Sequence, residues 1–510
     1  WSNMVSSAAS RWSRVQPELK SYNLEQIMIA IVKQMKTPSR ISSVLLAAFC
    51  LSQSLTAMSR VPNLAAIPAQ AERPNILFIF TDDWGWGDLS CHGHPYVKTP
   101  NIDRLAVEGT DFQRFTVASG VCSPSRAAVV TGQFPARLNI DGHFAWVDDN
   151  ARRGMPDWLD LNAPFLPRML QAGGYATAHF GKWHLANNMI PDSPAPGEYG
   201  YDVYGAFNCS GEQMPVHEDA DNAIAFIEQS HQASKPFFIN LWMHEPHTPF
   251  HTVPKYRWRF RDLKEADNVY ASVLSHADDR IGEVLDALDR LGLTENTLVI
   301  FSSDNGPARA ARPTALVLQH DTATGAGYGI GGAKGITAGR KGYKAALFEG
   351  GINVPFIVRW PGKVAAGQID AVSQISAVDL LPTFCEVAGV ALPASYQPDG
   401  VSQVSVLLGN EKPLREKPLF WKADAPWPAQ PERPDHWVSF AIVDQQWKLV
   451  ANQALDHVEL YDITADIYEQ NDLKVQHPEV VVQLRKQLEA WQQTLPSQPT
   501  GNVFSATRKK

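Results

Sequence analysis

The fold is decided by a short stretch near residue 80. Residues 75–83 read NILFIFTDD, an apolar run that ends in Thr81, Asp82 and Asp83. An apolar run of this length is typical of a strand buried on both faces of a parallel sheet. Ligand sites in open α/β sheets lie at the carboxyl ends of such strands. The stretch therefore predicts a buried strand that delivers two carboxylates to a binding site.

On either side of this stretch, predicted strands and helices alternate. This alternation indicates an α/β fold with a large, mostly parallel sheet between layers of helices. The glycine-rich residues 325–342 are expected to form a long loop. Strands are expected at residues 175–180, 237–243, 297–303 and 354–360, and helices at residues 101–108, 125–131, 164–172 and 262–291.

The pattern changes near residue 411. Residues 438–443 and 446–450 look like antiparallel strands, and a helix is expected at residues 478–495. A second, smaller α+β domain with an antiparallel sheet is therefore expected. The expected division is a catalytic domain at 73–410, the small domain at 411–495 and a frayed tail at 496–510.

The first 71 residues have the layout of an exported protein. Residues 1–34 show no periodicity and are expected to be an upstream extension, with a buried helix as the alternative. From Met35, a basic run, an apolar run and small residues follow in the order of a signal peptide. A lipid anchor at Cys50 is a second alternative. We expect a signal peptide and linker at 35–71, no transmembrane segment, and a secreted or periplasmic protein.

Composition narrows the class of protein. The chain has 510 residues, of which 44% are hydrophobic and 19% charged, so disorder and fibrous folds are excluded. The formal net charge is −8 and the sequence shows no evident basic face, so no nucleic-acid partner is expected. An acidic protein can bind an anion only through local cations or a metal.

A second pair of polar residues ends another predicted strand. Asp304 and Asn305 follow residues 297–303, as Asp82 and Asp83 follow the first strand. Either pair alone could merely cap its strand. Together they favour a metal site, because carboxylate and amide oxygens are hard ligands suited to Ca²⁺ or Mg²⁺.

One cysteine stands in an unusual setting. Residues 122–126 read CSPSR, which places Cys122 just before a predicted helix and near Arg126. A cysteine in such a place can be a thiolate nucleophile or a redox thiol, although an isolated buried cysteine more often only packs.

Cations and histidines follow other predicted strands. Lys182 and His184 stand in GKWH at 181–184, His244 and His247 follow residues 237–243, and Lys344 lies in a loop. The prolines beside the two histidines exclude the helical zinc motif HExxH. Together with the acids, these groups suit a tetrahedral oxyanion such as sulfate or phosphate.

These segments make residues 73–495 resemble the formylglycine-dependent sulfatases of the alkaline-phosphatase-like superfamily. The CSPSR run is the most specific of them, and WKL at 447–449 with ELYD at 459–462 resembles the second domain of the family. The other matching segments are PNI at 74–76, TDD at 81–83, GWGDL at 85–89, TPNIDRLA at 99–106, GKWHL at 181–185, PHTP at 246–249, SDNG at 303–306, Lys344, and EGG at 349–351.

The resemblance implies that Cys122 is oxidised to formylglycine by a separate formylglycine-generating or anaerobic sulfatase-maturing enzyme. The hydrated aldehyde would attack sulfur through one hydroxyl and expel sulfate through the other, which a plain serine or cysteine cannot do. The resemblance also implies one Ca²⁺ ion held by Asp82, Asp83, Asp304 and Asn305, beside residue 122. The remaining implied roles are Arg126 holding formylglycine, His184 as base, Lys182 and Lys344 on sulfate oxygens, and His247 with Lys344 protonating the leaving oxygen.

Some positions depart from the family pattern or stay open. Asn353 stands where the family often has arginine, with an effect expected at most on the rim of the site. Asn208 and Ser210 are candidates for a polar contact to sulfate. His244 could bind the sugar or hydrogen-bond locally.

The implied reaction is removal of sulfate from a sulfated glycan or an aryl sulfate. A phosphonate or phosphodiester hydrolase of the same superfamily is the alternative within the family. The alternative from another class is an inactive, secreted glycan-binding protein, whose mark would be loss of Cys122 or of a metal ligand. Three tryptophans, Trp421, Trp427 and Trp437, could line a carbohydrate cleft or simply pack.

Overall fold

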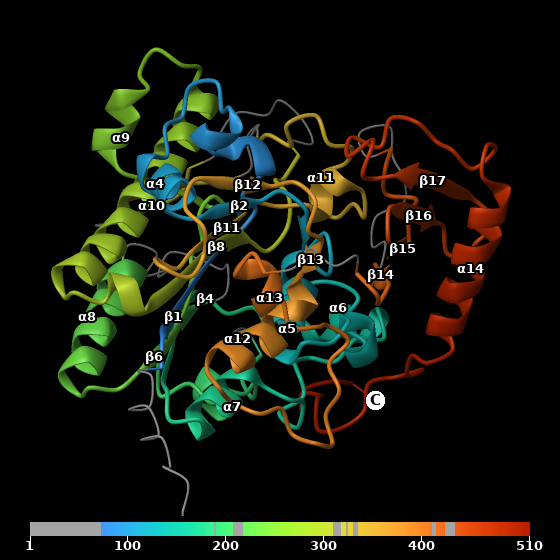
Figure 1. Ribbon diagram of the computed structural model, residues 1–510, viewed down its shortest axis with the longest axis horizontal. Helices are drawn as coiled ribbons and strands as arrows, with labels where there is room; N and C mark the ends of the chain where they lie inside the picture. The colour runs from blue at the N-terminus through green and yellow to red at the C-terminus, as the bar shows by residue number, and fades with distance from the viewer. Residues whose placement is uncertain are drawn as a thin grey trace, which may run out of the picture. The chain divides into compact units, whose positions relative to one another are not determined.

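The computed structural model divides the chain into two compact units, residues 1–71 and 72–510 (Figure 1). The expected extension and signal peptide fall in the first unit, outside the described residues. No helix in the described part of the chain is long and apolar enough to span a membrane. The structure describes residues 73–187, 190–207, 218–309, 318–322, 325–329, 335–410, 415–423 and 434–509.

The centre of the second unit is an eight-stranded sheet. Strand β1, Asn75–Thr81, lies near its middle and is buried along its whole length. Five neighbouring pairs are parallel and two, both involving β11, are antiparallel. The sheet is therefore mostly parallel, as predicted. Its order is β12 (Gln368–Asp370), β2 (Thr110–Phe112), β11 (Phe356–Arg359), β8 (Thr297–Ser303), β1, β6 (Phe237–Trp242), β4 (Ala176–Lys182) and β5 (Val203–Phe207).

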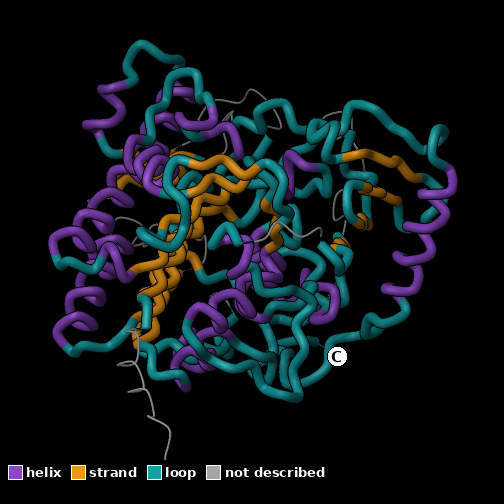
Figure 2. The backbone as a smooth tube through the Cα atoms, in the orientation of Figure 1, coloured by secondary structure: helices purple, strands orange, loops and turns teal. Residues whose placement is uncertain are grey.

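Helices cover both faces of this sheet (Figures 1 and 2). Side chains alternate along β1, so Leu77 and Ile79 join one apolar core and Phe78 and Phe80 join the other. The first core contains residues of α4 (Pro100–Glu108), α8 (Asp219–Gln232) and α10 (Glu265–Arg290). The second contains residues of α5 (Cys122–Thr131), α7 (Leu166–Ala172) and α12 (Leu380–Val387).

A four-stranded antiparallel sheet forms the smaller C-terminal part. Its strands are β14 (Leu419–Lys422), β15 (Phe440–Asp444), β16 (Trp447–Ala451) and β17 (Val458–Asp462), and α14 (Pro478–Gln492) packs on it. The predicted antiparallel sheet and C-terminal helix are confirmed. Short elements complete the fold: β3 (Phe115–Thr116), β7 (Phe250–Thr252), β9 (Leu318–Thr322), β10 (Gly325–Tyr328), β13 (Ile375–Ser376), α6 (Val147–Arg152), α9 (Pro254–Arg259), α11 (Glu349–Ile352) and α13 (Val404–Leu407).

Three local predictions are wrong. The helix expected from Ser125 begins at Cys122, so Cys122 is itself the first helical residue. The predicted glycine-rich loop contains strand β10, which pairs with β7 and β9. The tail is not frayed: the Val503 side chain is buried, and the Asp157 backbone N–H donates to the Val503 carbonyl at 2.8 Å. Arg508 also pairs with the Asp157 carboxylate, so burial and charge together hold the tail.

Candidate active site and metal centre

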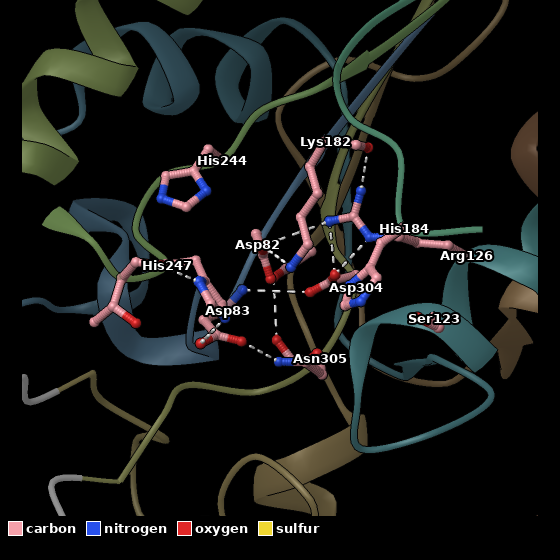
Figure 3. Close-up of polar contacts among 12 residues, drawn as sticks. Asp82, Asp83, Ser123, Arg126, Lys182, His184, His244, His247, Asp304 and Asn305 are labelled. Carbon is pink, nitrogen blue, oxygen red and sulfur yellow. Dashed lines mark hydrogen bonds and ion pairs between the residues drawn. The ribbon is translucent and has the colours of Figure 1, made fainter. Parts of the chain in front are cut away.

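Two strand ends bring the predicted acids together. Strands β1 and β8 pair in parallel register, with Thr81 opposite Ser303, so the residues after them are neighbours. The Asp304 backbone N–H donates to the Thr81 carbonyl at 3.0 Å, and the Asn305 amide donates to Asp83 Oδ1 at 2.7 Å. Figure 3 shows the three carboxylates and Asn305 pointing toward one another. The predicted gathering at this sheet edge is confirmed.

Two oxygens in this cluster are buried without a hydrogen-bond partner among the described residues. They are Asp82 Oδ1 and Asn305 Oδ1. Unsatisfied acceptors within a cluster of carboxylates are open to a positive partner such as a metal ion. Ligand atoms of Asp82, Cys122 and Asp304 also lie within 4.8 Å of one another. Hard oxygen donors in this arrangement fit a divalent cation such as Ca²⁺.

Three cations contact the same acids. Arg126 reaches Asp304 Oδ2 through Nε at 2.8 Å and through Nη2 at 2.7 Å, and Lys344 Nζ lies 2.6 Å from Asp83 Oδ1. Lys182 Nζ pairs with Asp82 Oδ2. Three carboxylates therefore face three cations. A divalent cation and a divalent oxyanion can enter together without changing this balance of charge.

The buried charges shift the pKa values of the carboxyls in opposite directions. Burial opposes ionisation of Asp82, but His247, Lys182 and Arg126 face it and hold the pKa of that carboxyl well below its usual range. Burial raises the pKa of Asp83 despite Lys344, and burial beside Asp82 raises that of Asp304 well above normal. Burial thus makes Asp83 and Asp304 harder to ionise, and a bound cation would favour their charged forms.

Cys122 is placed by the turn before α5. The Val121 backbone N–H donates to Ser119 Oγ at 3.3 Å, and Ser125 Oγ donates to the Ser119 carbonyl at 2.8 Å. A Cβ on Gly120 would lie 2.5 Å from the Ala346 carbonyl oxygen, so a larger residue does not fit there. This packing fixes Cys122, which is 3% exposed, against the strand-end acids.

His184 is a neutral base in this structure. Its Nε2 donates to the Phe144 carbonyl at 2.9 Å, so Nδ1 carries the lone pair. Burial, with help from Lys182, lowers the pKa of His184 to about 3. The ring is therefore neutral at ordinary pH and can accept a proton.

The loop after β6 holds the other two histidines, of which His247 lies between two cis proline bonds and His244 precedes both. His247 Nε2 lies 3.9 Å from Asp83 Oδ2, and burial lowers the pKa of His247 well below normal. His244 is fully buried, and its Nε2 donates to the Pro249 carbonyl at 3.1 Å. This contact matches the alternative in which His244 hydrogen-bonds locally. The predicted sulfate contacts Asn208 and Ser210 lie outside the described residues.

A cavity of about 210 Å³ opens beside the turn that carries Cys122. Lys344 lines it, as do Tyr343 beside it and Val121 beside Cys122. The other lining residues belong to no motif, so sequence reasoning missed them: His143, Ala308, Arg309, Ala345, Ala346, Asp435 and His436.

Two of the three tryptophans pack in the structure. Trp421 is buried and donates to the Val117 carbonyl, and Trp437 packs on His457. Trp427 falls outside the described residues.

A second buried cluster of charge joins the small domain to the site. Lys448 Nζ lies 2.7 Å from Glu349 Oε1 and 2.8 Å from Glu469 Oε1, and all three side chains are buried. Glu349 begins α11, whose Gly351 carbonyl accepts from the Gly306 backbone N–H directly after Asn305. The C-terminal sheet is thereby connected to the strand end that holds the acids.

Asn353 lies on the other side of this turn. It is 1% exposed, and its Oδ1 accepts from Arg340 Nε at 3.1 Å. Asn353 is therefore a buried support of the 340–344 loop and has no place on the rim.

In this α/β fold, strand-end oxygens, three cations and a neutral histidine surround a cysteine at the start of a helix. This arrangement defines a metal-assisted hydrolase for esters of a tetrahedral oxyanion. Comparison with known proteins identifies the family. Residues 74–390 match the family model described as Sulfatase, and residues 341–494 match that of the N-sulphoglucosamine sulphohydrolase C-terminal region.

Relatives agree with these matches. N-acetylgalactosamine-6-sulfatase of Mus musculus is 30% identical over 72% of this chain and 72% of its own length. Arylsulfatase A of Homo sapiens is 31% identical over 70% and 72%. The crystal structure of Ps i-CgsB in complex with k-i-k-neocarrahexaose has the same fold, with a TM-score of 0.68 and 24% identity over 85% of this chain and 95% of that one.

The chain belongs to the sulfatase family of the alkaline-phosphatase-like superfamily. It is an enzyme that hydrolyses sulfate esters.

Proposed function

We propose that this enzyme removes sulfate from a sulfated carbohydrate, using formylglycine made from Cys122 by a maturation enzyme. The observation that carries the proposal is the position of Cys122, whose ligand atom lies within 4.8 Å of those of Asp82 and Asp304. Formylglycine there would supply a hydroxyl nucleophile and a route for releasing sulfate that serine or cysteine lacks.

The proposed cation is Ca²⁺, held by Asp82, Asp83, Asp304 and Asn305 beside residue 122. The orphaned oxygens of Asp82 and Asn305 support this assignment, because they need a positive partner. Bound Ca²⁺ would polarise the sulfate oxygens.

The protein's own groups would divide the remaining work. Arg126, held by Asp304 and by the Lys182 carbonyl, fixes the region around residue 122. Lys182 and Lys344 would bind sulfate oxygens, because their ammonium groups lie beside Asp82 and Asp83, two of the proposed metal ligands.

Two histidines would move protons. His184 accepts a proton at Nδ1, because its Nε2 is engaged with Phe144. His247 and Lys344 both lie against Asp83, and together they deliver the proton to the leaving oxygen.

The leaving group would be a sugar in the 210 Å³ cavity. Arg309 and His436 line it together with the Asp435 carboxyl, and these groups suit a ligand rich in hydroxyls. The named relatives include a sulfatase of a sulfated aminosugar and a protein crystallised with a neocarrahexaose, which supports a glycan substrate. We propose export to the periplasm or beyond, on the signal-peptide pattern of residues 35–71.

Two measurements test this proposal. The first is the mass of the peptide that contains Cys122, isolated from active enzyme; we expect the aldehyde, and an intact thiol in fully active enzyme would contradict the mechanism. The second is a panel of sulfated mono- and oligosaccharides, an aryl sulfate and phosphate esters. Turnover of the aryl sulfate alone would remove the glycan substrate, and faster phosphate ester turnover would favour a phosphonate or phosphodiester hydrolase.

A further inference from the structure

A basic and aromatic surface lies outside the catalytic site. It is formed by residues 255–264, which read KYRWRFRDLK and run from α9 (Pro254–Arg259) to Lys264, the residue before α10. Five of these residues are cations and one is an acid, so this segment carries a formal charge of +4 in a chain of net charge −8. Such a concentration of positive charge attracts polyanions even when the whole protein is acidic.

Part of this charge is not neutralised by neighbours. Lys255 lies 3.8 Å from Asp279, and Arg257 lies 3.9 Å from Glu265. By contrast, no ion pair within the described ranges involves Arg259, Arg261 or Lys264, which are all exposed. Three cations are thus available to an anionic ligand.

An exposed aromatic ring stands among these cations. Trp258 is 69% exposed, and the Arg261 guanidinium lies over its ring at 4.3 Å. An exposed tryptophan face can stack on a sugar ring. The cations match sulfate groups and the ring matches a sugar face, so the combined chemistry fits a sulfated glycan better than a protein or a lipid.

This surface lies within reach of the catalytic site. His247 and Trp258 are 11 residues apart, and chain geometry limits their separation to roughly 40 Å. One sulfated polysaccharide chain is long enough to contact both places.

We propose that residues 255–264 form a second binding surface for a sulfated polysaccharide, which holds the polymer while one of its sulfate esters occupies the catalytic site. The inference rests on the proposed glycan substrate. It predicts that the surface raises affinity for the polymer by linking two contacts, and that it leaves small substrates unaffected.

The test compares Arg259→Ala/Arg261→Ala with a matched variant, Arg485→Ala/Lys486→Ala, which removes two exposed cations from α14. We expect the first variant to raise KM for a sulfated polysaccharide roughly five- to tenfold, and to leave kcat/KM for a sulfated monosaccharide unchanged. Trp258→Ala should raise KM for the polymer to a smaller extent. Equal KM values for the first variant and the wild type on the polymer, or an equal loss on the monosaccharide, would overturn the proposal.

A binding measurement separates this surface from catalysis. Cys122→Ala protein, which needs no activity, is titrated with chondroitin sulfate, with a carrageenan, with their desulfated forms and with duplex DNA. We expect binding to at least one sulfated polymer that the Arg259→Ala/Arg261→Ala changes weaken, and little binding to the desulfated forms. If the enzyme desulfates no glycan but this binding holds, only the proposed substrate is wrong. Equally tight binding of DNA, weakened by the same changes, would show a general polyanion surface and overturn the assignment.

Discussion

The molecule contains two buried clusters of charge, and they are built differently. The catalytic cluster sets Asp82, Asp83 and Asp304 against three cations, yet leaves Asp82 Oδ1 and Asn305 Oδ1 without hydrogen-bond partners in the described part of the chain. Among the described residues, the domain-joining cluster pairs Glu349 and Glu469 with one cation, Lys448, and each carboxylate lies within 2.8 Å of the ammonium group.

The difference separates a binding site from a structural contact. In the catalytic cluster the charges balance, but Asp82 Oδ1 and Asn305 Oδ1 have neither a hydrogen bond nor an ion pair among the described residues, so a cation can be added. In the domain-joining cluster both carboxylates pair with Lys448, and Glu469 Oε1, which also lacks a hydrogen bond, lies 2.8 Å from the ammonium group, but one negative charge is in excess. Burial raises the pKa of Glu469 to about 7 even though Lys448 opposes the shift, so below this pH a proton relieves the excess. Buried charge by itself therefore does not indicate function.

The largest effect is expected at Cys122, which belongs only to the catalytic cluster. Cys122→Ala should lower kcat by about 10⁴-fold or more, because no other group supplies the nucleophile. The unfolding midpoint should change little by comparison. Cys91→Ala, which changes an exposed cysteine, is the matched control and should keep full activity. Substantial turnover by folded Cys122→Ala protein would contradict the assigned nucleophile.

Removal of the metal is the next test of the difference between the two clusters. Chelation should abolish turnover, Ca²⁺ should restore it, and added Ca²⁺ should raise the Tm. Asp304→Asn should weaken the response to Ca²⁺ by more than about a hundredfold, since it removes a ligand oxygen charge. Glu349→Gln makes the same chemical change in the domain-joining cluster and should keep the Ca²⁺ response. A wild-type protein whose activity and Tm ignore chelator would argue against the metal centre.

Lys448→Met tests the domain-joining cluster. It leaves two buried carboxylates without a cation, so the free energy of unfolding should fall by about 3–5 kcal/mol. Denaturant titration of this variant beside Lys486→Met, an exposed lysine on α14, measures the effect. Equal stabilities for the two variants would mean that the small domain is held mainly by apolar packing.

The smallest effect is expected for Glu469→Gln and depends on pH. The pKa of Glu469 is about 7 in the folded protein and about 4.5 when unfolded, so the folded state holds an extra proton between these values. Wild-type stability from this group is present below pH 4.5 and is lost as pH rises through 7. The variant lacks this titration, so it should match the wild type near pH 5 and be more stable by roughly 2–3 kcal/mol at pH 8. Parallel stability curves between pH 5 and pH 8 would rule this out.

Several features followed from local sequence pattern. An apolar run ending in Asp82 and Asp83 predicted a buried strand, and a second run ending in Asp304 and Asn305 predicted another. Their meeting was foreseeable because parallel strands end at a common edge. The start of α5 was misplaced by three residues, because the turn at Ser119 and Gly120 that positions Cys122 depends on contact with the distant residues 345 and 346.

The sequence by itself determined the α/β fold, the strand-end acids and the segment around Cys122, because strand periodicity and short motifs are local properties. Only the tertiary structure decided which oxygens lack partners, which residues line the cavity, and how Lys448 reaches Glu349 across 99 positions of chain. These features depend on long-range packing, which sets burial and distance between side chains that no local pattern relates.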